Sequence, residues 1–211
     1  MMTATIFWDV DTQYDFIQPD GKLYVAGAET ITPVLRALTE YAHAHGIRIV
    51  ASADDHVPGH RELSATPDFR TTFPEHCMRG TPGQRKIGET RLRDPLVIEP
   101  DPDPGIAAKV RAHAGDILFH KHWFDVFTNT NVQAVLDVLR PLRIILYGVA
   151  TDVCDKYAIE GLLERAPQAE LSFIVDAARA IHPDDVDVLL ETWRARGVRM
   201  VTAAEILAGG A

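Results

Sequence analysis

The sequence has few of the features that mark secreted, membrane or nucleic-acid-binding proteins. Only two of its 211 residues are cysteines, so disulfide bonds do not hold the fold together. No apolar run approaches the length of about 18 residues that a membrane-spanning helix needs. A signal peptide is not expected, because Asp9 and Asp11 interrupt the short apolar stretch near the N-terminus. Lysine and arginine total 21 against 30 acidic residues, a formal charge of −9, which argues against nucleic acid as a partner. We therefore expect a cytoplasmic protein with no membrane partner.

The composition is that of a folded, globular chain. Hydrophobic residues make up 46% of the sequence and charged residues 24%, which argues against wholesale disorder. The length suits one domain, and no internal repeat, low-complexity tract or linker divides residues 1–211. We therefore expect a single domain.

Short β-rich runs and helical patterns alternate along the chain. The runs predict six strands, at residues 5–10, 47–52, 116–120, 143–149, 171–175 and 198–201. Helical spacing predicts helices at residues 30–45, 131–139, 153–165, 183–196 and 203–207. This alternation favours an α/β fold, a three-layer α/β/α sandwich around a six-stranded, mostly parallel sheet. Residues 54–103 lack such periodicity, and a loop region of this length is usually functional.

Reactive side chains follow four successive strands of this prediction. Asp11 follows the first strand, Asp54 and His56 follow the second, Lys121 ends the third, and Cys154 follows the fourth. Ligands of open α/β sheets bind at the carboxyl ends of the strands. The sequence therefore predicts one site at this edge of the sheet.

Cys154 lies where an apolar strand turns into a helix. A thiol in the first helical turn is close to unpaired N–H groups and to the positive end of the helix dipole, which favour the thiolate. A small buried hydrophobe is the alternative interpretation. Lys121 could stabilise the thiolate and Asp11 could accept the thiol proton, although each alone could equally be a solvated strand end or a turn cap. The three together predict a nucleophilic cysteine, and Cys77 lacks such a setting.

The long segment after the second strand concentrates metal-binding residue types. Asp54, His56 and His60 lie within one short stretch, and His76 could supply a fourth ligand. Imidazole and carboxylate ligands suit zinc, iron or manganese. The alternative is a solvated polar loop whose histidines bind nothing.

These motifs resemble those of the isochorismatase-like cysteine hydrolases, and within them the nicotinamidases. The resemblance covers essentially the whole chain and is based on residues 11–16 (DTQYDF), 54–56 (DDH), 74–83 (PEHCMRGTPG) and 149–154 (VATDVC), with Lys121 between them. Phe73 stands where the family often has tryptophan. The resemblance implies the catalytic residues Asp11, Lys121 and Cys154 and the metal ligands Asp54, His56, His60 and His76.

The resemblance also implies a reaction. The expected activity is deamidation of a small carboxamide through a thioester, with nicotinamide as the leading substrate and nicotinic acid and ammonia as products. The N–H groups of Ala150 and Cys154 would form the oxyanion hole, beside a cis peptide bond between Val149 and Ala150. One divalent ion, zinc first with iron or manganese as alternatives, would bind the ring nitrogen of the substrate, and Phe16 and Phe73 would pack against the ring.

The sequence leaves two alternatives to a metal-containing amidohydrolase. A metal-free member of the superfamily would act on a carbamoyl or ureido compound or on a vinyl ether. A catalytically silent member would only bind a small molecule. The family also implies a homo-oligomer, either a dimer or a tetramer. The basic segment 84–93 has no role in this interpretation.

Overall fold

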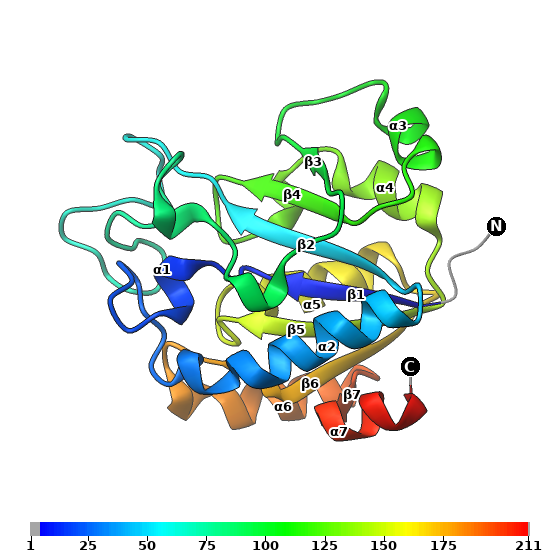
Figure 1. Cartoon of the computed structure of the whole chain (residues 1–211). Coiled ribbons are helices and arrows are strands. Elements are labelled where there is room, and N and C mark those ends of the chain that lie inside the picture. The colour runs from blue at the N-terminus through cyan, green and yellow to red at the C-terminus, as the bar shows by residue number, and fades with distance from the viewer. Residues whose placement is uncertain (1–4, 211) are drawn as a thin grey trace.

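The computed structural model describes residues 5–210, and its centre is one seven-stranded sheet (Figure 1). The strands are β1 (Thr5–Val10), β2 (Arg48–Asp54), β3 (Leu96–Ile98), β4 (Ile117–Lys121), β5 (Arg143–Val149), β6 (Glu170–Arg179) and β7 (Arg199–Val201). Their order is β3-β4-β2-β1-β5-β6-β7, and every neighbouring pair is parallel. The predicted α/β fold with a parallel sheet is confirmed.

Helices cover both faces of this sheet. Within the described residues they are α1 (Tyr14–Ile17), α2 (Thr32–Ala44), α3 (Ile106–Ala112), α4 (Val132–Leu139), α5 (Cys154–Arg165), α6 (Val186–Ala195) and α7 (Ala203–Glu205). Short 3₁₀ helices lie at Ala28–Ile31, Pro82–Gln84, Gly88–Thr90, Val126–Thr128 and Pro183–Asp185, and a π-helical turn lies at Ile206–Gly210. Helix α2 lies on one face of the sheet, and α4 and α5 lie on the other (Figure 1). No helix in the part of the chain that the structure describes is long and apolar enough to cross a membrane.

The predicted count of six strands is wrong by one. Strand β3 lies inside the segment that the sequence analysis expected to be a loop, and it pairs with β4 through Leu96 and Ile117. The strand is only three residues long and lies between two prolines, Pro95 and Pro100. It is therefore too short for an alternation of apolar and polar residues to appear in the sequence. Its parallel pairing with β4 stabilises this three-residue strand.

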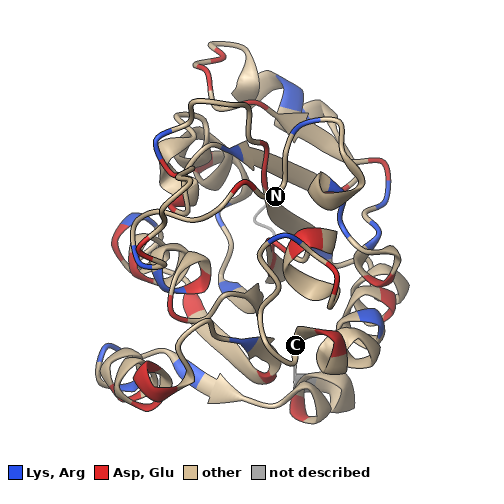
Figure 2. Cartoon of the chain, turned by 90° about the vertical axis from the view of Figure 1, so that its left-hand side faces the viewer, with Lys and Arg blue, Asp and Glu red and all other residues tan. Residues whose placement is uncertain are grey.

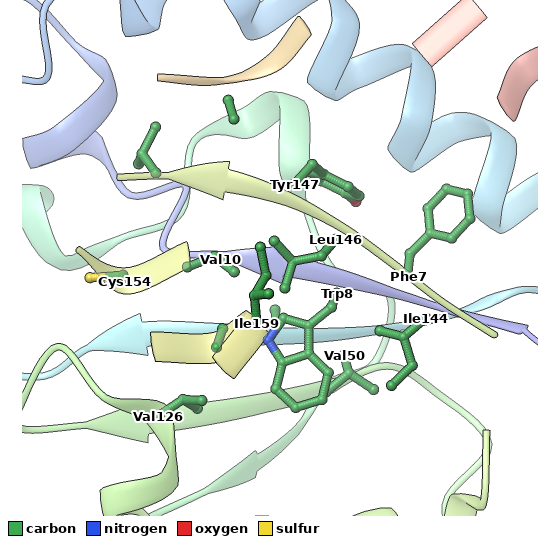
Figure 3. Packing of buried hydrophobic residues seen from close by; sticks show 14 of the residues in the cluster. Phe7, Trp8, Val10, Val50, Val126, Ile144, Leu146, Tyr147, Cys154 and Ile159 are labelled. Carbon is green, nitrogen blue, oxygen red and sulfur yellow. The ribbon is translucent and has the colours of Figure 1, made fainter. Parts of the chain in front are cut away.

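The core fills the space between the sheet and both helical layers. Successive side chains of β1 point to opposite faces, as the period of a strand requires. Phe7 packs against Tyr41 of α2 and Tyr147 of β5, with ring centroids 6.3 and 6.1 Å apart. Trp8 points to the other face, where Phe119 of β4 lies 6.1 Å away. Figure 3 shows Phe7, Trp8 and Tyr147 in this packing, and Cys154 belongs to the same apolar cluster.

The strands end together at one edge of the sheet. The arrows of β1, β2, β4 and β5 in Figure 1 point to the same side, and the long connection between β2 and β3 covers that side. Figure 2 views the molecule from there and shows acidic and basic positions interspersed around the edge. Any side chain that follows a central strand is therefore brought to this covered edge.

Candidate active site and metal centre

Four neighbouring strands bring the predicted catalytic residues together. In the sheet order β4-β2-β1-β5, Lys121 ends β4, Asp54 ends β2, Asp11 follows β1 and Cys154 follows β5. Asp54 and Lys121 are register partners in the β2–β4 pairing. All four residues are buried. The expectation that these strand ends share one rim therefore agrees with the geometry.

Lys121 is the centre of this group. Its Nζ lies 2.9 Å from Oδ2 of Asp11, 2.5 Å from Oδ1 of Asp54 and 3.7 Å from Sγ of Cys154. Burial opposes the ammonium charge, yet the carboxylates of Asp11 and Asp54 hold the pKa of Lys121 well above its ordinary value. Lys121 is therefore a fixed cation beside the thiol, and the alternative of a solvated lysine does not fit.

Asp11 is held in an unusual backbone conformation. Its φ of +45° lies in the left-handed region, which residues other than glycine seldom adopt. Its Oδ1 accepts a hydrogen bond from Oγ of Ser52 at 2.7 Å, and its Oδ2 faces Lys121. One carboxylate oxygen of Asp11 lies within 4.8 Å of Sγ of Cys154. The carboxylate is thus oriented toward the thiol rather than used as a turn cap.

Cys154 is the first residue of α5 and follows a tight turn from β5. The peptide bond between Val149 and Ala150 is cis, as the resemblance implies. Gly148 precedes it with a φ of +138°, and a Cβ there would lie 2.1 Å from the carbonyl oxygen of Val10. Only glycine allows β5 to pass β1 this closely. Because Cys154 begins a helix, its N–H is among the groups that no carbonyl within the helix accepts.

The thiol of Cys154 does not have the low pKa that the helix start predicts. Burial raises its pKa well above the ordinary value, and Lys121 opposes that effect only in part because Asp11 and Asp54 add negative charge nearby. Burial and the neighbouring carboxylates therefore oppose formation of the thiolate. A resting thiol of this kind needs a base close by to ionise.

A second cluster adjoins the first through Asp54. One ligand atom from each of Asp54, His56, Glu62 and His76 lies within 4.8 Å of the others, and all four residues are buried. Nε2 of His76 is 3.5 Å from both Asp54 and Glu62, and Nε2 of His56 is 3.9 Å from both. These separations exceed hydrogen-bond length and leave room for an ion between the four groups.

The unpaired atoms of this cluster fit a metal ion. Nε2 of His56, Nε2 of His76, Oδ2 of Asp54 and Oε2 of Glu62 are buried without hydrogen-bond partners. Nδ1 of His76 lies 2.7 Å from the carbonyl of Pro74, which fixes the ring with Nε2 toward the cluster. Orphaned buried polar atoms are costly unless something satisfies them. Two imidazoles and two carboxylates are a suitable ligand set for zinc, iron or manganese.

The two histidines have opposite protonation tendencies. Burial lowers the pKa of His56 to about 4. For His76, burial is outweighed by Asp54 and Glu62, which raise its pKa to about 10. Burial together with the charge of Asp54 raises the pKa of Glu62. Coordination of a cation here requires loss of the His76 proton, because only neutral imidazole binds a metal.

The structure places His60 beside this cluster rather than in it. Its Nδ1 lies 3.2 Å from Nδ1 of His56, the nitrogen that points away from the other three residues. Glu62, which the sequence analysis did not single out, takes the remaining corner. The available signal was a carboxylate six positions after His56 in the same segment, but spacing alone does not separate Glu62 from His60.

An enclosed pocket joins the two clusters. It has a volume of about 10 Å³, and it is lined by Phe16, Leu23, Asp54, Glu62, Phe73, Ala150, Val153, Cys154 and Ile181. The rings of Phe16 and Phe73 lie 5.3 and 6.2 Å from that of His76, between centroids. A water molecule needs about 10–15 Å³, so the pocket is closed to larger molecules in this conformation. Phe16 and Phe73, which the resemblance implies as substrate-packing residues, both line this pocket.

The basic segment 84–93 packs against the site only in part, because Arg85, Arg91 and Arg93 are exposed. Nζ of Lys86 lies 3.1 Å from Oδ1 of Asp9, and the two side chains are 9% and 0% exposed. The side chain of Gln13 bonds the backbone of Asp54 in both directions, at 2.7 and 2.8 Å, and donates to the carbonyl of Gln84 at 2.6 Å. The segment therefore supports the strand ends that carry the candidate catalytic residues.

The fold and the site together define an α/β protein whose sheet is covered on both faces, with a buried Asp–Lys–Cys group beside a cluster of residues that could hold a metal ion. The isochorismatase domain model matches residues 3–205, and the chain belongs to the isochorismatase family. The resemblance stated from the sequence is thereby confirmed.

Individual relatives are more distant. The chain is 25% identical to the nicotinamidase/pyrazinamidase of Mycobacterium tuberculosis over 198 residues, which cover 92% of this chain and 97% of that protein. It is 28% identical to the ureidoacrylate amidohydrolase RutB of Yersinia enterocolitica over 153 residues, 69% of this chain and 63% of that protein. The crystal structure of the pyrazinamidase of Pyrococcus horikoshii in complex with zinc superposes with a TM-score of 0.74 at 23% identity, covering 94% of this chain and 98% of that one.

Proposed function

We propose that the protein is a metal-containing cysteine amidohydrolase that deamidates a small neutral carboxamide, with nicotinamide as the leading candidate. The observation that supports this most is the shared position of Asp54, which contacts Lys121 on one side and belongs to the candidate metal cluster on the other. A nucleophile and a ligand-binding cluster thus face one pocket. The similarity to a nicotinamidase/pyrazinamidase and to a pyrazinamidase in complex with zinc supports the same activity.

The geometry suggests how each catalytic residue acts. Asp11 takes the proton of Cys154, and the thiolate sulfur attacks the carboxamide carbon. The N–H groups of Ala150 and Cys154 stabilise the resulting oxyanion, and one such donor is worth about 3–4 kcal/mol. Asp11 returns the proton to the departing ammonia, which leaves a thioester. Water then cleaves the thioester, giving the carboxylic acid and free thiol, while Lys121 stabilises the negative charge throughout.

The metal ion would be held by Asp54, His56, Glu62 and His76. When bound, it supplies an electrophilic position that can coordinate and orient a ring nitrogen of the substrate. His60 is not needed as a ligand in this arrangement. The protein residues Phe16 and Phe73 provide flat apolar walls for the ring.

The pocket lining favours an uncharged substrate. Its only charged lining residues are Asp54 and Glu62, and no lysine or arginine lines the pocket to pair with a carboxylate. Lys121 and the metal already balance the charge of Asp54 and Glu62, so an anionic substrate would find no further cation in the lining to pair with its carboxylate. A neutral aromatic amide is compatible with the walls once the pocket opens.

Opening of the pocket requires part of its wall to move. Glu62 and Phe73 lie at the two ends of one loop (residues 62–73, the 62–73 loop), which is closed by a hydrogen bond from the N–H of Phe73 to the carbonyl of Glu62 at 2.8 Å. The tip of the loop is tied down where Nε2 of His182 lies 2.9 Å from the carbonyl of Phe69. Surface loops of this kind commonly gate active sites. We propose that movement of the 62–73 loop at its Phe73 end admits the substrate, while Glu62 stays in the candidate metal cluster.

A comparison of two matched amides tests the proposal. Ammonia release is measured with nicotinamide and with benzamide, which has the same shape but no ring nitrogen. We expect turnover of nicotinamide, a higher KM for benzamide, and loss of this difference after chelation or in His56→Ala and His76→Ala. The exposed His45→Ala should behave as the wild type.

The similarity to a ureidoacrylate amidohydrolase supports a second candidate. Metal-free protein that releases ammonia only from ureido or carbamoyl acids would assign the chain to the metal-independent activity. Binding of amides without any turnover would instead indicate a silent, binding member of the family.

A further inference from the structure

His60 occupies a defined place next to the candidate metal cluster. It lies in the turn that follows β2, where its own N–H donates to the carbonyl of Val57 at 3.3 Å. Its Nδ1 is 3.4 Å from the N–H of Val57 and 3.2 Å from Nδ1 of His56. One ring nitrogen of His60 therefore meets both a backbone donor and the ring of a candidate ligand.

The direction of these hydrogen bonds follows from the donors present. A backbone N–H can only donate, so Nδ1 of His60 acts as the acceptor for Val57. An unprotonated Nδ1 of His60 has no hydrogen to give to His56, so Nδ1 of His56 must carry the hydrogen in that contact. The neutral imidazole of His56 then has its lone pair on Nε2. That is the nitrogen that faces Asp54 and Glu62 without a partner.

Two ring contacts hold the His60 turn in place. The rings of His60 and His122 lie 4.3 Å apart between centroids, and the guanidinium of Arg61 lies 3.9 Å from the ring centre of Trp123. Both partners follow Lys121 directly in sequence, at the end of β4. The His60 turn is therefore packed against the same strand end that supplies the candidate catalytic lysine.

We propose that His60 is a positioning residue that fixes the tautomer and orientation of His56 for metal binding, and that it is not itself a ligand. This inference rests on the metal site of the proposed function. Partners that hold the second nitrogen of a metal-binding histidine typically contribute about tenfold to 100-fold to metal affinity. Loss of His60 should therefore weaken the site without removing a ligand.

Two substitutions at position 60 separate a positioning residue from a ligand. His60→Ala removes the acceptor, whereas His60→Asn keeps an oxygen acceptor at the position of Nδ1 and removes the imidazole. The zinc Kd of each variant is measured by competition with a chromophoric chelator, with His45→Ala as the control. We expect His60→Ala to bind zinc about tenfold to 100-fold more weakly and His60→Asn to stay close to the wild type. X-ray absorption of the zinc-loaded wild type should show two imidazole ligands.

Three results would overturn the proposal. Equal loss of affinity in both variants, together with three imidazoles in the absorption spectrum, would make His60 a ligand. Unchanged affinity in His60→Ala would remove any role. Nitrogen NMR of the metal-free protein gives a readout that is independent of zinc, and protonation of His56 at Nε2 instead of Nδ1 would contradict the hydrogen-bond assignment. A wild type that binds no zinc would refute the metal site of the proposed function, and the NMR result would still decide the role of His60.

Discussion

The buried ion pair between Asp9 and Lys86 offers a test of the structure that does not depend on the proposed activity. Nζ of Lys86 lies 3.1 Å from Oδ1 of Asp9, which also accepts a hydrogen bond from Oγ1 of Thr12 at 2.9 Å. The substitution Lys86→Met keeps the apolar stem and removes the charge, so the carboxylate of Asp9 is left buried without its cation. Removal of one partner of a buried pair costs about 3–5 kcal/mol of unfolding free energy. At about 2–4 °C per kcal/mol for a chain of this size, Tm should fall by about 10 °C.

The assay is denaturant and thermal unfolding followed by circular dichroism. Lys109→Met is the matched control, because Nζ of Lys109 lies 2.6 Å from Asp103 but the two side chains are 58% and 30% exposed. An exposed pair of this kind contributes at most about 1 kcal/mol. The double variant Asp9→Asn/Lys86→Met, which removes both charges, should recover at least half of the stability lost in Lys86→Met.

The loss in Lys86→Met should also depend on pH. Burial raises the pKa of Asp9, and Lys86 and Thr12 oppose that rise. Without Lys86 the pKa of Asp9 rises further, so the folded state binds the proton more tightly than the unfolded chain. Stability of the variant then falls as the pH rises from about 4, the pKa of an unfolded aspartate, toward the raised folded value. A loss of unfolding free energy in Lys86→Met that is no larger than in Lys109→Met, or that is the same at every pH, would refute this reasoning.

Three further predictions concern the candidate site. Cys154→Ala should abolish turnover and leave the circular dichroism spectrum unchanged. Cys77→Ala should keep kcat and lower the free energy of unfolding by about 1 kcal/mol, because it leaves a small cavity. Equal loss of activity in both variants would exclude Cys154 as the nucleophile. Asp11→Asn and Lys121→Met should each lower kcat by orders of magnitude. Either change added to Cys154→Ala should have little further effect on kcat, because the three residues act as one unit. Multiplicative losses of kcat would show that they act separately. His182→Ala removes the nitrogen that lies 2.9 Å from the Phe69 carbonyl, so it should change kcat and KM together if the 62–73 loop gates the pocket. Unchanged kcat and KM would show that another segment opens the pocket.

The central elements could be predicted because burial on both faces gives a strong signal. The expected strand at residues 143–149 coincides with β5, whose residues after Arg143 are all buried. The helix expected at residues 30–45 appears as α2 from Thr32, with Pro33 in its first turn, where proline is tolerated. Strand β3 and helix α3 gave no comparable signal. Each is short, and each is stabilised by contacts with a neighbouring element, β4 for β3 and α4 for α3.

Gly83 shows how a residue in a short sequence motif can be required by a contact with a residue far away in the sequence. Gly83 lies in the segment that supported the family resemblance, and a Cβ there would lie 2.1 Å from Oδ2 of Asp15. That carboxylate oxygen accepts the N–H of Cys77 at 2.7 Å, next to His76. A side chain at position 83 would therefore displace the group that anchors the chain at His76. The sequence marks the glycine, but only the fold shows that it protects a candidate metal ligand.

The choice between His60 and Glu62 depends on the path of the chain between them. The carbonyl of His60 accepts the N–H of Leu63 at 2.9 Å, and the carbonyl of Glu62 accepts the N–H of Phe73 at 2.8 Å. These two hydrogen bonds turn the segment so that Glu62 faces Nε2 of His76, whereas His60 lies next to Nδ1 of His56. The spacing of residue types does not reveal these two hydrogen bonds, so it could identify the loop but not the candidate ligand within it. The result has a chemical consequence, since a second carboxylate in place of a third imidazole makes the group more anionic and its ligands harder. A set of two imidazoles and two carboxylates would bind manganese or iron more readily than three imidazoles with one carboxylate, so the metal that copurifies is expected to follow the supply of these ions and not to be zinc alone.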